Sequence, residues 1–341
     1  MHRKNSWWPG WALVLLAGLL IQSALASQPK SIVDTAFVQE AARRGVILWD
    51  VRGWPAYRQG HIPGAVGIGS VVGVLRNDHD EDYIPLPRME AILGEAGIDP
   101  AKEIVVYGDK ASPSTYFALV TLQYLGAKQA YAYHGGIDDW VEAGLPVSRE
   151  YQPLAPVKLR LEPNPALQVS TREVLERVKQ GGAQILDVRG PAEYTGQDIR
   201  ALRGGHIPGA VNIPYEQNWK DPEVRRKLAK RQVKTTEGLN LKSLEELRAL
   251  YKDLDPARET VVYCQSGSRA AVTTAVLREM GFKDVKIYDS SWLGYGSRMD
   301  APAENETFLN VGSLLSQISD LESRIEGLEE GLANLRKATA R

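Results

Sequence analysis

The sequence predicts an α/β protein made of two copies of one domain, each a parallel sheet with helices on both faces, followed by a C-terminal coiled-coil helix. Three observations lead to this prediction. Short motifs recur in the same order in the two halves, strand-like runs alternate with helical patterns, and the C-terminal segment carries a heptad repeat. At 341 residues the chain has room for about two domains.

The N-terminal segment, residues 1–26, has the composition of a secretory signal peptide. Arg3 and Lys4 precede the apolar run of residues 12–21, and a small-x-small cleavage site ends at Ala26. The alternative is an uncleaved membrane anchor, but the run is shorter than the ~20 residues that a membrane span needs. We therefore expect export to the periplasm, an oxidising compartment in which a lone thiol is unusual.

The repeat is visible in three motifs whose separation grows along the chain. Asp-Val-Arg-Gly at 50–53 recurs at 187–190, His-Ile-Pro-Gly-Ala-Val at 61–66 recurs at 206–211, and Val-Val-Tyr at 105–107 recurs at 261–263. The offsets are 137, 145 and 156 residues (187 minus 50, 206 minus 61, 261 minus 105). The second copy therefore contains insertions, which indicates that the two copies have diverged in use.

We expect the first copy at residues 27–150 and the second at 169–305, with residues 151–168 as a linker in a proline-rich stretch without periodicity. The predicted strands are 46–49, 104–107, 130–133, 185–188, 260–263 and 285–288. The predicted helices are 37–44, 116–125, 174–180 and 270–280. This alternation is typical of a parallel sheet that is covered on both faces.

Residues 306–341 are predicted to form a helix that oligomerises. Apolar residues recur at alternating steps of three and four, which gives heptad a and d positions. They are Val311, Leu314, Ile318, Leu321, Ile325, Leu328, Leu332 and Leu335. This seam predicts a homo-oligomer through residues 311–335, with a parallel dimer favoured; the alternative is one amphipathic helix that folds back on its own domain.

The only cysteine of the chain, Cys264, follows the predicted strand 260–263 and precedes a helix, with a Gly/Ser loop between. Amide N–H groups and the positive end of a helix dipole stabilise an anion at such a point and so favour a thiolate. Arg269 adds a cation at the end of the loop. The alternative is an inert, buried cysteine, but the polar loop favours a reactive nucleophile.

The first copy has Gly108 where the second has Cys264, and an acid, Asp109, follows it. We therefore expect the first copy to be catalytically inactive and to serve as an interface or as one wall of a cleft.

These motifs resemble the tandem rhodanese family, the thiosulfate sulfurtransferases, in its exported bacterial form. The resemblance covers roughly residues 30–305. It is carried by Asp-Val-Arg at 187–189, Gly-His-Ile-Pro-Gly-Ala at 205–210, Cys-Gln-Ser-Gly-Ser-Arg at 264–269, the C-terminal signature at 291–296 with Pro-Ala-Glu at 302–304, and the first-domain signature at 134–140.

The resemblance implies a two-step sulfur transfer in which Cys264 attacks a donor such as thiosulfate, forms a persulfide and passes the sulfur to a thiol or cyanide-like acceptor. It implies neither a cofactor nor a metal. The substrate-binding candidates are Gln265, Ser266, Gly267, Ser268, Arg269 and Arg189. Arg189 and Asp187 also stand in the silent copy as Arg52 and Asp50, and His206 as His61, which favours a structural role for these three residues of the second copy.

Two other functions stay open at the level of the sequence. One is a persulfide or chalcogen carrier that serves an exported partner without turnover. The other is a Cys-dependent phosphatase of related fold, but only four residues separate Cys264 from Arg269, one fewer than a phosphate-binding loop of that type has. With 41 basic and 42 acidic residues, the chain has no global positive charge to hold nucleic acid.

Overall fold

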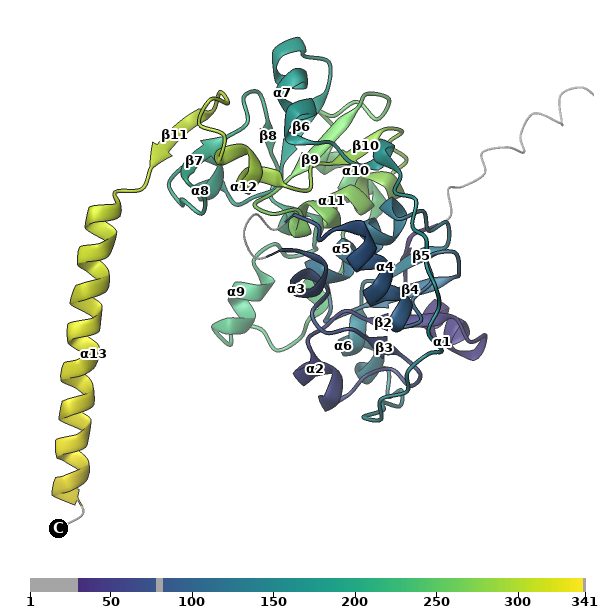
Figure 1. Cartoon of the computed structure of the whole chain (residues 1–341), viewed down its shortest axis with the longest axis horizontal. Helices are drawn as coiled ribbons and strands as arrows, with labels where there is room; N and C mark the ends of the chain where they lie inside the picture. Colours follow the sequence, from purple (N-terminus) through teal and green to yellow (C-terminus); the bar gives the residue numbers. More distant parts are fainter. Residues whose placement is uncertain (1–29, 78–81, 340–341) are drawn as a thin grey trace, which may run out of the picture. The chain divides into compact units, whose positions relative to one another are not determined.

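The computed structural model describes residues 30–77 and 82–339, so the predicted signal segment at 1–26 lies outside the described residues. The first copy of the domain contains one five-stranded sheet, in the order β1-β5-β4-β2-β3, in which every pair of neighbours is parallel. Its elements are β1 (Ile32–Val33), α1 (Thr35–Arg43), β2 (Ile47–Asp50), α2 (Trp54–Gln59), β3 (Val66–Gly67), α3 (Val71–Leu75), α4 (Leu86–Glu95), β4 (Ile104–Tyr107), α5 (Pro113–Tyr124), β5 (Ala130–Tyr133) and α6 (Gly136–Glu142) (Figure 1).

The second copy repeats this arrangement with a four-stranded parallel sheet in the order β10-β9-β6-β8. Its elements are the short 3-10 helix η1 (Pro165–Leu167), α7 (Thr171–Gln180), β6 (Gln184–Asp187), α8 (Pro191–Tyr194), β7 (Arg203–His206), β8 (Val211–Asn212), η2 (Tyr215–Asn218), α9 (Val224–Ala229), η3 (Glu237–Leu239), α10 (Leu244–Leu250), β9 (Thr260–Tyr263), α11 (Ser268–Glu279), β10 (Val285–Ile287) and α12 (Ser291–Gly296). The predicted fold class, two α/β domains with parallel sheets flanked by helices, is confirmed.

The sequence prediction missed a two-stranded antiparallel ribbon. β11 (Glu304–Phe308) pairs with β7, so the chain is still a strand at residues 306–308, where a helix was predicted. The C-terminal helix, α13, spans Val311–Thr339 and begins after this ribbon. The helical periodicity starts at Val311, and the preceding strand residues alternate too briefly to be recognised.

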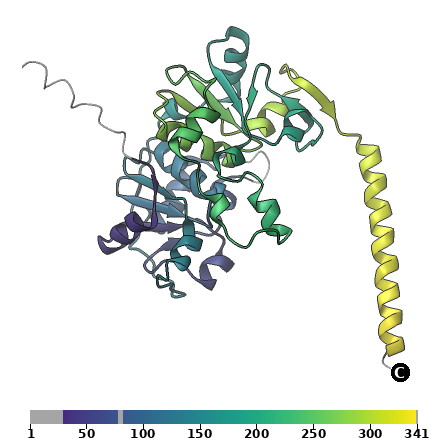
Figure 2. The same ribbon diagram turned by 180° about the vertical axis from the view of Figure 1, so that it is seen from behind.

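Helices α5 and α11 pack against each other and join the two copies (Figures 1 and 2). Residues 115–122 of α5 and 270–277 of α11 are buried without interruption. A helix that is covered by a sheet on one face and by another helix on the opposite face is apolar all round, so it lacks the amphipathic pattern of a surface helix. One hydrophobic core consequently contains residues of both copies, Cys264 among them.

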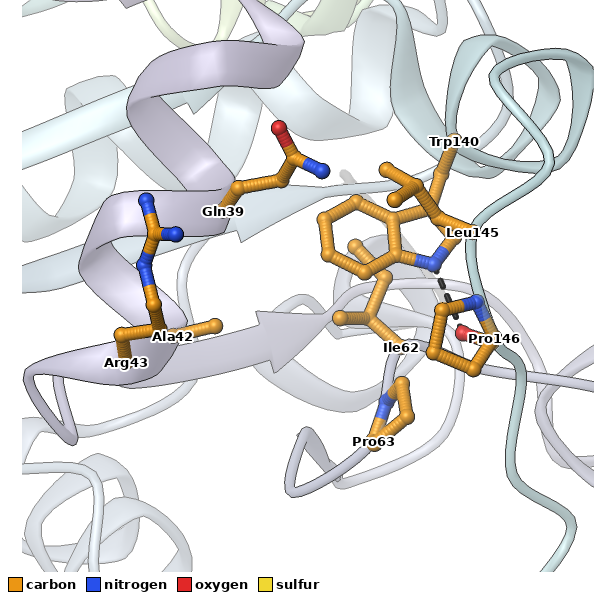
Figure 3. A pocket seen from close by; sticks show the side chains of 8 residues that line it. All are labelled: Gln39, Ala42, Arg43, Ile62, Pro63, Trp140, Leu145 and Pro146. Atoms are coloured by element: carbon orange, nitrogen blue, oxygen red, sulfur yellow. Dashed lines mark hydrogen bonds between the residues drawn. The ribbon is translucent and has the colours of Figure 1, made fainter.

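A hydrogen bond connects α6, the last helix of the first copy, to the start of the proline-rich stretch. The indole Nε1–H of Trp140 donates to the carbonyl of Pro146 at 2.8 Å, and both residues line a cavity in this copy (Figure 3). Further on, the amide of Val157 donates to the carbonyl of Gly94, and the amide of Leu161 donates to Glu90. The linker thus has no helix or strand between residues 151 and 164 but is hydrogen-bonded to α4.

None of the helices among the described residues is both long and apolar enough to cross a membrane.

Candidate active site

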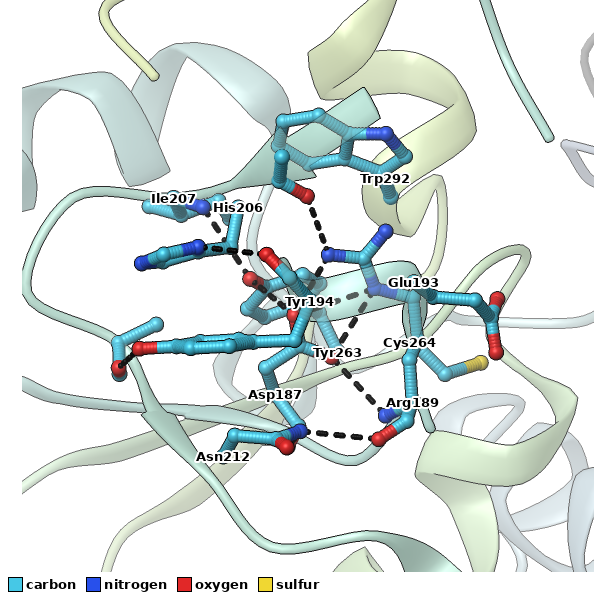
Figure 4. A network of polar contacts seen from close by, with 12 residues as sticks. Asp187, Arg189, Glu193, Tyr194, His206, Ile207, Asn212, Tyr263, Cys264 and Trp292 are labelled. Carbon is cyan, nitrogen blue, oxygen red and sulfur yellow. Dashed lines mark hydrogen bonds and ion pairs between the residues drawn. The ribbon is translucent and has the colours of Figure 1, made fainter. Parts of the chain in front are cut away.

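Cys264 lies directly after β9, the strand that β6 and β10 flank, and four residues before α11 begins at Ser268. Its side chain is 1% exposed. Figure 4 shows Cys264 together with the polar network of Asp187 and Arg189 in the same domain. Among the described residues, none accepts a hydrogen bond from the amide N–H groups of residues 265–268. These amides, which open a helix, form the kind of site that binds an anion.

The loop turns at Gly267, which has a φ of +87°, a left-handed conformation that favours glycine. A Cβ atom at this position would lie 2.6 Å from Nη2 of Arg76 and 2.6 Å from Oδ1 of Asp289. Arg76 belongs to the first copy, and its Nη2 donates to that Asp289 oxygen at 2.6 Å. A residue of the first copy, Arg76, therefore lies against one side of the loop around the cysteine.

A second segment, residues 291–293, is hydrogen-bonded to the backbone of the loop. The amide of Cys264 donates to Oγ of Ser291 at 3.1 Å, and the amide of Trp292 donates back to the carbonyl of Cys264 at 3.0 Å. The amide of Leu293 donates to the carbonyl of Gln265 at 2.9 Å. Ser291 and its neighbours belong to the predicted C-terminal signature, so one function of that signature is to fix the backbone on either side of the thiol.

Arg269 forms a two-point ion pair with Glu193 of α8, with N–O distances of 2.6 and 2.7 Å. Burial disfavours the charged guanidinium of Arg269, but its hydrogen bonds to Glu193 and the charge at Cys264 outweigh burial and raise its pKa. Burial likewise works against ionisation of Glu193, yet the hydrogen bonds from Arg269 lower the pKa of this carboxyl. Arg269 is therefore a permanent cation at the predicted anion site, as the sequence prediction requires.

Arg189 is 1% exposed and lies inside the domain. Its Nε and Nη2 bind both carboxylate oxygens of Asp187, and Nη2 also donates to the carbonyl of Gly205 (Figure 4). In the first copy Arg52 binds Asp50 and the carbonyl of Gly60 in the same way. Because the first copy, which has no thiol, keeps the same contacts, they favour a structural role for Arg189 over the predicted role in substrate binding.

His206 has the same duplicated surroundings. Its ring stacks on Tyr194 with 3.6 Å between centroids, and Nδ1 is 2.8 Å from the carbonyl oxygen of Tyr194. In the first copy His61 stacks on Tyr57 at 3.8 Å and makes the equivalent contact at 2.9 Å. Both histidines hold a turn, which agrees with the structural role expected for His206.

The remaining loop candidates lie at different depths. Gln265 is buried and donates from Nε2 to the carbonyl of Arg200, while its Oε1 has no hydrogen-bond partner. Ser266 and Ser268 are half-buried, and Ser268 opens α11. The structure thus places Cys264 and residues 265–269 in one loop, whereas the Arg189 side chain is buried inside the domain and bound to Asp187.

Sequence reasoning missed Arg76, Glu193 and Asp289. Arg76 is hidden because it stands 188 residues before Cys264 in the other copy. Glu193 offered a signal, since it replaces Ala56 of the first copy at the same offset of 137 residues that separates the Asp-Val-Arg motifs.

Two cavities lie away from the loop that carries Cys264. Two cavities, one lined by Trp140 and Pro146 and the other by Trp54, Tyr57 and Tyr151, belong to the first copy and to the segment that leaves it. Within residues 30–77 and 82–339, no cluster of His, Cys, Asp and Glu could hold a metal ion.

Comparison with known proteins gives consistent matches. The model of the rhodanese-like domain matches twice, at residues 34–143 and 170–298. The thiosulfate sulfurtransferase of Corynebacterium glutamicum is 35% identical over 263 residues, which cover 73% of this chain and 81% of that protein. That of Azotobacter vinelandii is 32% identical over 82% of this chain and 98% of its own length. The sulfur carrier protein TtuD of Thermus thermophilus is 31% identical over 81% of this chain and 97% of its own length.

Solved structures share the fold at lower identity. The wild-type structure of EanB superposes with a TM-score of 0.70 at 19% identity and covers 82% of this chain and 70% of its own. The anaerobic ergothioneine biosynthesis enzyme from Chlorobium limicola gives a TM-score of 0.69, also at 19% identity, over 81% of this chain and 70% of its own.

Proposed function

The chain belongs to the rhodanese family of sulfurtransferases, and we propose that Cys264 carries the transferred sulfur as a persulfide, with thiosulfate or a similar sulfane-sulfur compound as the donor. The similarity to two thiosulfate sulfurtransferases supports the choice of donor. The observation that carries the assignment to Cys264 is the position of the only thiol of the chain, at a helix N-terminus whose loop amides have no acceptor among the described residues.

The proposed reaction has two steps. The Cys264 thiolate attacks the outer sulfur of thiosulfate, a new S–S bond forms, and sulfite leaves with the electron pair of the S–S bond that breaks. A thiophilic acceptor such as cyanide or a thiolate then attacks the outer sulfur of the persulfide and regenerates the Cys264 thiolate. The amides of residues 265–269 and the Arg269 cation stabilise the anionic sulfur in both steps. Since the chain has no second cysteine, the acceptor must come from outside.

Intact-mass measurement after exposure to thiosulfate tests this proposal. The wild type is expected to gain the mass of one sulfur atom and to lose it when cyanide is added, whereas Cys264→Ser gains nothing. If the wild type gains no sulfur from thiosulfate, mercaptopyruvate or a polysulfide, the proposal is wrong.

A persulfide carrier without turnover is the second candidate, and the similarity to the sulfur carrier protein of Thermus thermophilus supports it. Both candidates form the same persulfide. Steady-state thiocyanate formation from thiosulfate and cyanide separates them, because a carrier loads once and turns over very slowly without its partner. Hydrolysis of a generic aryl phosphate tests the phosphatase alternative, and no hydrolysis is expected.

We further propose that α13 forms a parallel homo-oligomeric coiled coil. Its seam residues are between 43% and 72% exposed, so none is buried against the chain's own domains. Val311, Ile318 and Ile325 at the a positions and leucine at every d position favour a dimer, and Arg324 at g would pair with Glu329 at e of the partner helix. Light scattering on the full chain and on a chain that ends at Asn310, which keeps β11 intact, tests this. Equal monomeric masses would contradict it.

We also propose export to the periplasm through residues 1–26, on the composition of that segment alone. N-terminal sequencing of the protein recovered from a periplasmic fraction is expected to begin at Ser27.

A further inference from the structure

The first copy lacks the nucleophile but reaches the loop that carries it. Arg76, which follows α3 of the first copy, is 4% exposed, and its guanidinium lies over the ring of Phe117 at 4.4 Å and near that of Tyr83 at 5.5 Å. These rings hold the guanidinium in one place while Nη2 binds Asp289 of the second copy at 2.6 Å. Six residues further on, Asp82 accepts a hydrogen bond from Ser290 at 2.8 Å.

The contact with Asp289 is also a contact with the catalytic loop. Nη2 of Arg76 and Oδ1 of Asp289 occupy the space where a side chain of residue 267 would stand. Asp289 lies two residues before Ser291, whose hydroxyl accepts the amide of Cys264. Arg76 therefore touches both backbone segments that position the thiol.

Arg76 keeps its positive charge inside the protein. Burial opposes the charged form of Arg76, but the negative charge of Asp289 and the hydrogen bond to its carboxylate raise the pKa of Arg76. The second carboxylate oxygen of Asp289, Oδ2, is buried and has no hydrogen-bond partner. The pair is thus an incompletely satisfied ion pair inside the protein, which is costly unless it serves the neighbouring site.

From this geometry we infer that Arg76 is a positioning residue through which the silent copy shapes and charges the anion site at Cys264. The inference rests on the proposed function for its purpose. It extends the site from one domain to two, so that the second copy alone does not contain the complete site.

The charged and titratable groups around the thiol come from several elements. Arg269 of α11 and Arg76 carry positive charge, and each is paired with a carboxylate, Glu193 and Asp289 respectively. Tyr215 of η2 lies in the same hydrophobic core as Cys264, and burial raises its pKa to about 12, so it stays neutral at working pH. Arg76 and Arg269 are thus the two buried cations that contact the loop carrying Cys264 or its flanking residues.

Alkylation measures this directly, because Cys264 is the only cysteine of the chain. We compare the rates with iodoacetamide, which is neutral, and with iodoacetate, which is anionic, in the wild type, Arg76→Met and Arg76→Lys across a range of pH. In Arg76→Met the midpoint of the pH–rate profile is expected to rise by about one unit, which slows alkylation about tenfold near neutral pH. The ratio of the iodoacetate to the iodoacetamide rate is expected to fall about fivefold, and Arg76→Lys to recover part of both effects.

Gln123→Ala is the matched control. Oε1 of Gln123 accepts another hydrogen bond between the copies, from Nη1 of Arg278 at 2.7 Å, near the end of α11 that is far from Cys264. Its removal is expected to leave the rate ratio and the midpoint unchanged. A change in access to the thiol would alter both reagents equally, so it cannot imitate the loss of charge.

An unchanged rate ratio and midpoint in Arg76→Met would overturn the inference, and so would an equal change in Gln123→Ala. Alkylation does not require sulfur transfer, so this outcome is independent of the mass measurement that tests the proposed function. If Arg76→Met fails to fold, the rate ratio and the midpoint are compared between Arg76→Lys and the wild type. A partial shift of both quantities is expected, and no shift of either would overturn the inference.

Discussion

The loops that carry Cys264 and Gly108 follow the same path but use their backbone groups in opposite ways. The amide of Ile137 donates to the carbonyl of Gly108 at 2.9 Å, just as that of Trp292 donates to the carbonyl of Cys264 at 3.0 Å. Ala111, at φ +58°, stands where Gly267 stands at φ +87°. The backbone of the catalytic turn is thus present in both copies.

The difference lies in what occupies the turn. In the first copy the amide of Lys110 donates to Asp138, that of Ala111 to the carbonyl of His134, and that of Ser112 to the carbonyl of Asp109. In the second copy the corresponding amides have no acceptor among the described residues. We therefore expect the Gly108 loop to be inactive for two reasons: it lacks a thiol, and carbonyl and carboxylate groups of the first copy already accept hydrogen bonds from its amides.

The largest effect is expected when a thiol is returned to the silent loop. We predict that Gly108→Cys, combined with Cys264→Ser, transfers sulfur at least roughly a thousandfold more slowly than the wild type. The loop amides of the first copy already have acceptors, and this loop has no arginine at the position that corresponds to Arg269. A Cβ at residue 108 would also lie 3.0 Å from Oγ1 of Thr115, which crowds the new side chain. The rate of thiocyanate formation checks this, and transfer near the wild-type rate would refute the comparison of the loops.

The two copies also present different titratable residues to each other at equivalent positions. His134 follows Tyr133 in the first copy, and Asp289 follows Tyr288 in the second. Burial lowers the pKa of His134 to about 4, although its Nε2 contact with the Leu239 carbonyl opposes this effect. Burial raises the pKa of Asp289 to about 6 against the opposing charge of Arg76.

These two shifts predict opposite pH dependences. The unfolded chain protonates His134 near pH 6.5, so its contribution is present above that pH and is lost as the pH falls toward 4. Asp289 binds its proton more tightly in the folded state, so its contribution is present below about pH 4 and is lost as the pH rises toward 6. The contribution of each residue changes the free energy of unfolding by about 3 kcal/mol over its pH range. Because the two changes have opposite signs, they largely cancel in the wild type between pH 4 and 6.

Single variants remove the cancellation. Relative to the wild type, His134→Gln is expected to lose stability as the pH rises from 4 to 6, and Asp289→Asn to gain it, in urea unfolding followed by circular dichroism. If the free energy of unfolding changed with pH in the same way in both variants, the predicted titrations of His134 and Asp289 would be wrong.

The left-handed position of the two loops gives a smaller, reciprocal pair of effects. Gly267→Ala is expected to destabilise the protein by about 1–3 kcal/mol and to slow transfer about tenfold, because a Cβ there meets Arg76 and Asp289. Ala111→Gly relieves a strained residue in the silent copy and is expected to stabilise the protein by about 1 kcal/mol without a change in transfer. Thermal melts and transfer rates check both, and a tolerated Gly267→Ala would mean that the loop can move away from Arg76.

The smallest effect concerns α13, which has no counterpart in the first copy. Gly327 has nothing within 4 Å of the position of a Cβ, so Gly327→Ala should gain only helix propensity, about 1 kcal/mol. Replacement of Ile325 at the adjacent a position by Asn is the contrasting variant, and is expected to weaken the oligomer. Light scattering at several concentrations measures both changes, and equal behaviour of the two variants would contradict the proposed seam.

The sequence by itself determined the duplicated fold and the position of the thiol at the start of a helix. The repeated motifs, the β-branched runs and the proline-rich linker are local patterns, and a strand followed by a Gly/Ser loop and a helix places Cys264 at a helix N-terminus without reference to other contacts. The structural role expected for His206 followed in the same way, from its repetition in a copy that lacks the thiol.

Only the tertiary structure decided which residues complete the site. Arg76 and Asp289 are 213 residues apart, and Glu193 and Arg269 are 76 apart, so their ion pairs depend on how α5 and α11 pack and on the positions of the β-strand ends. The antiparallel ribbon of β7 and β11 likewise pairs segments about a hundred residues apart that have no strong alternation of their own. Periodicity indicates which face of an element is buried, but it does not indicate which distant charge lies opposite that face, because ion pairs between distant residues depend on how the elements pack.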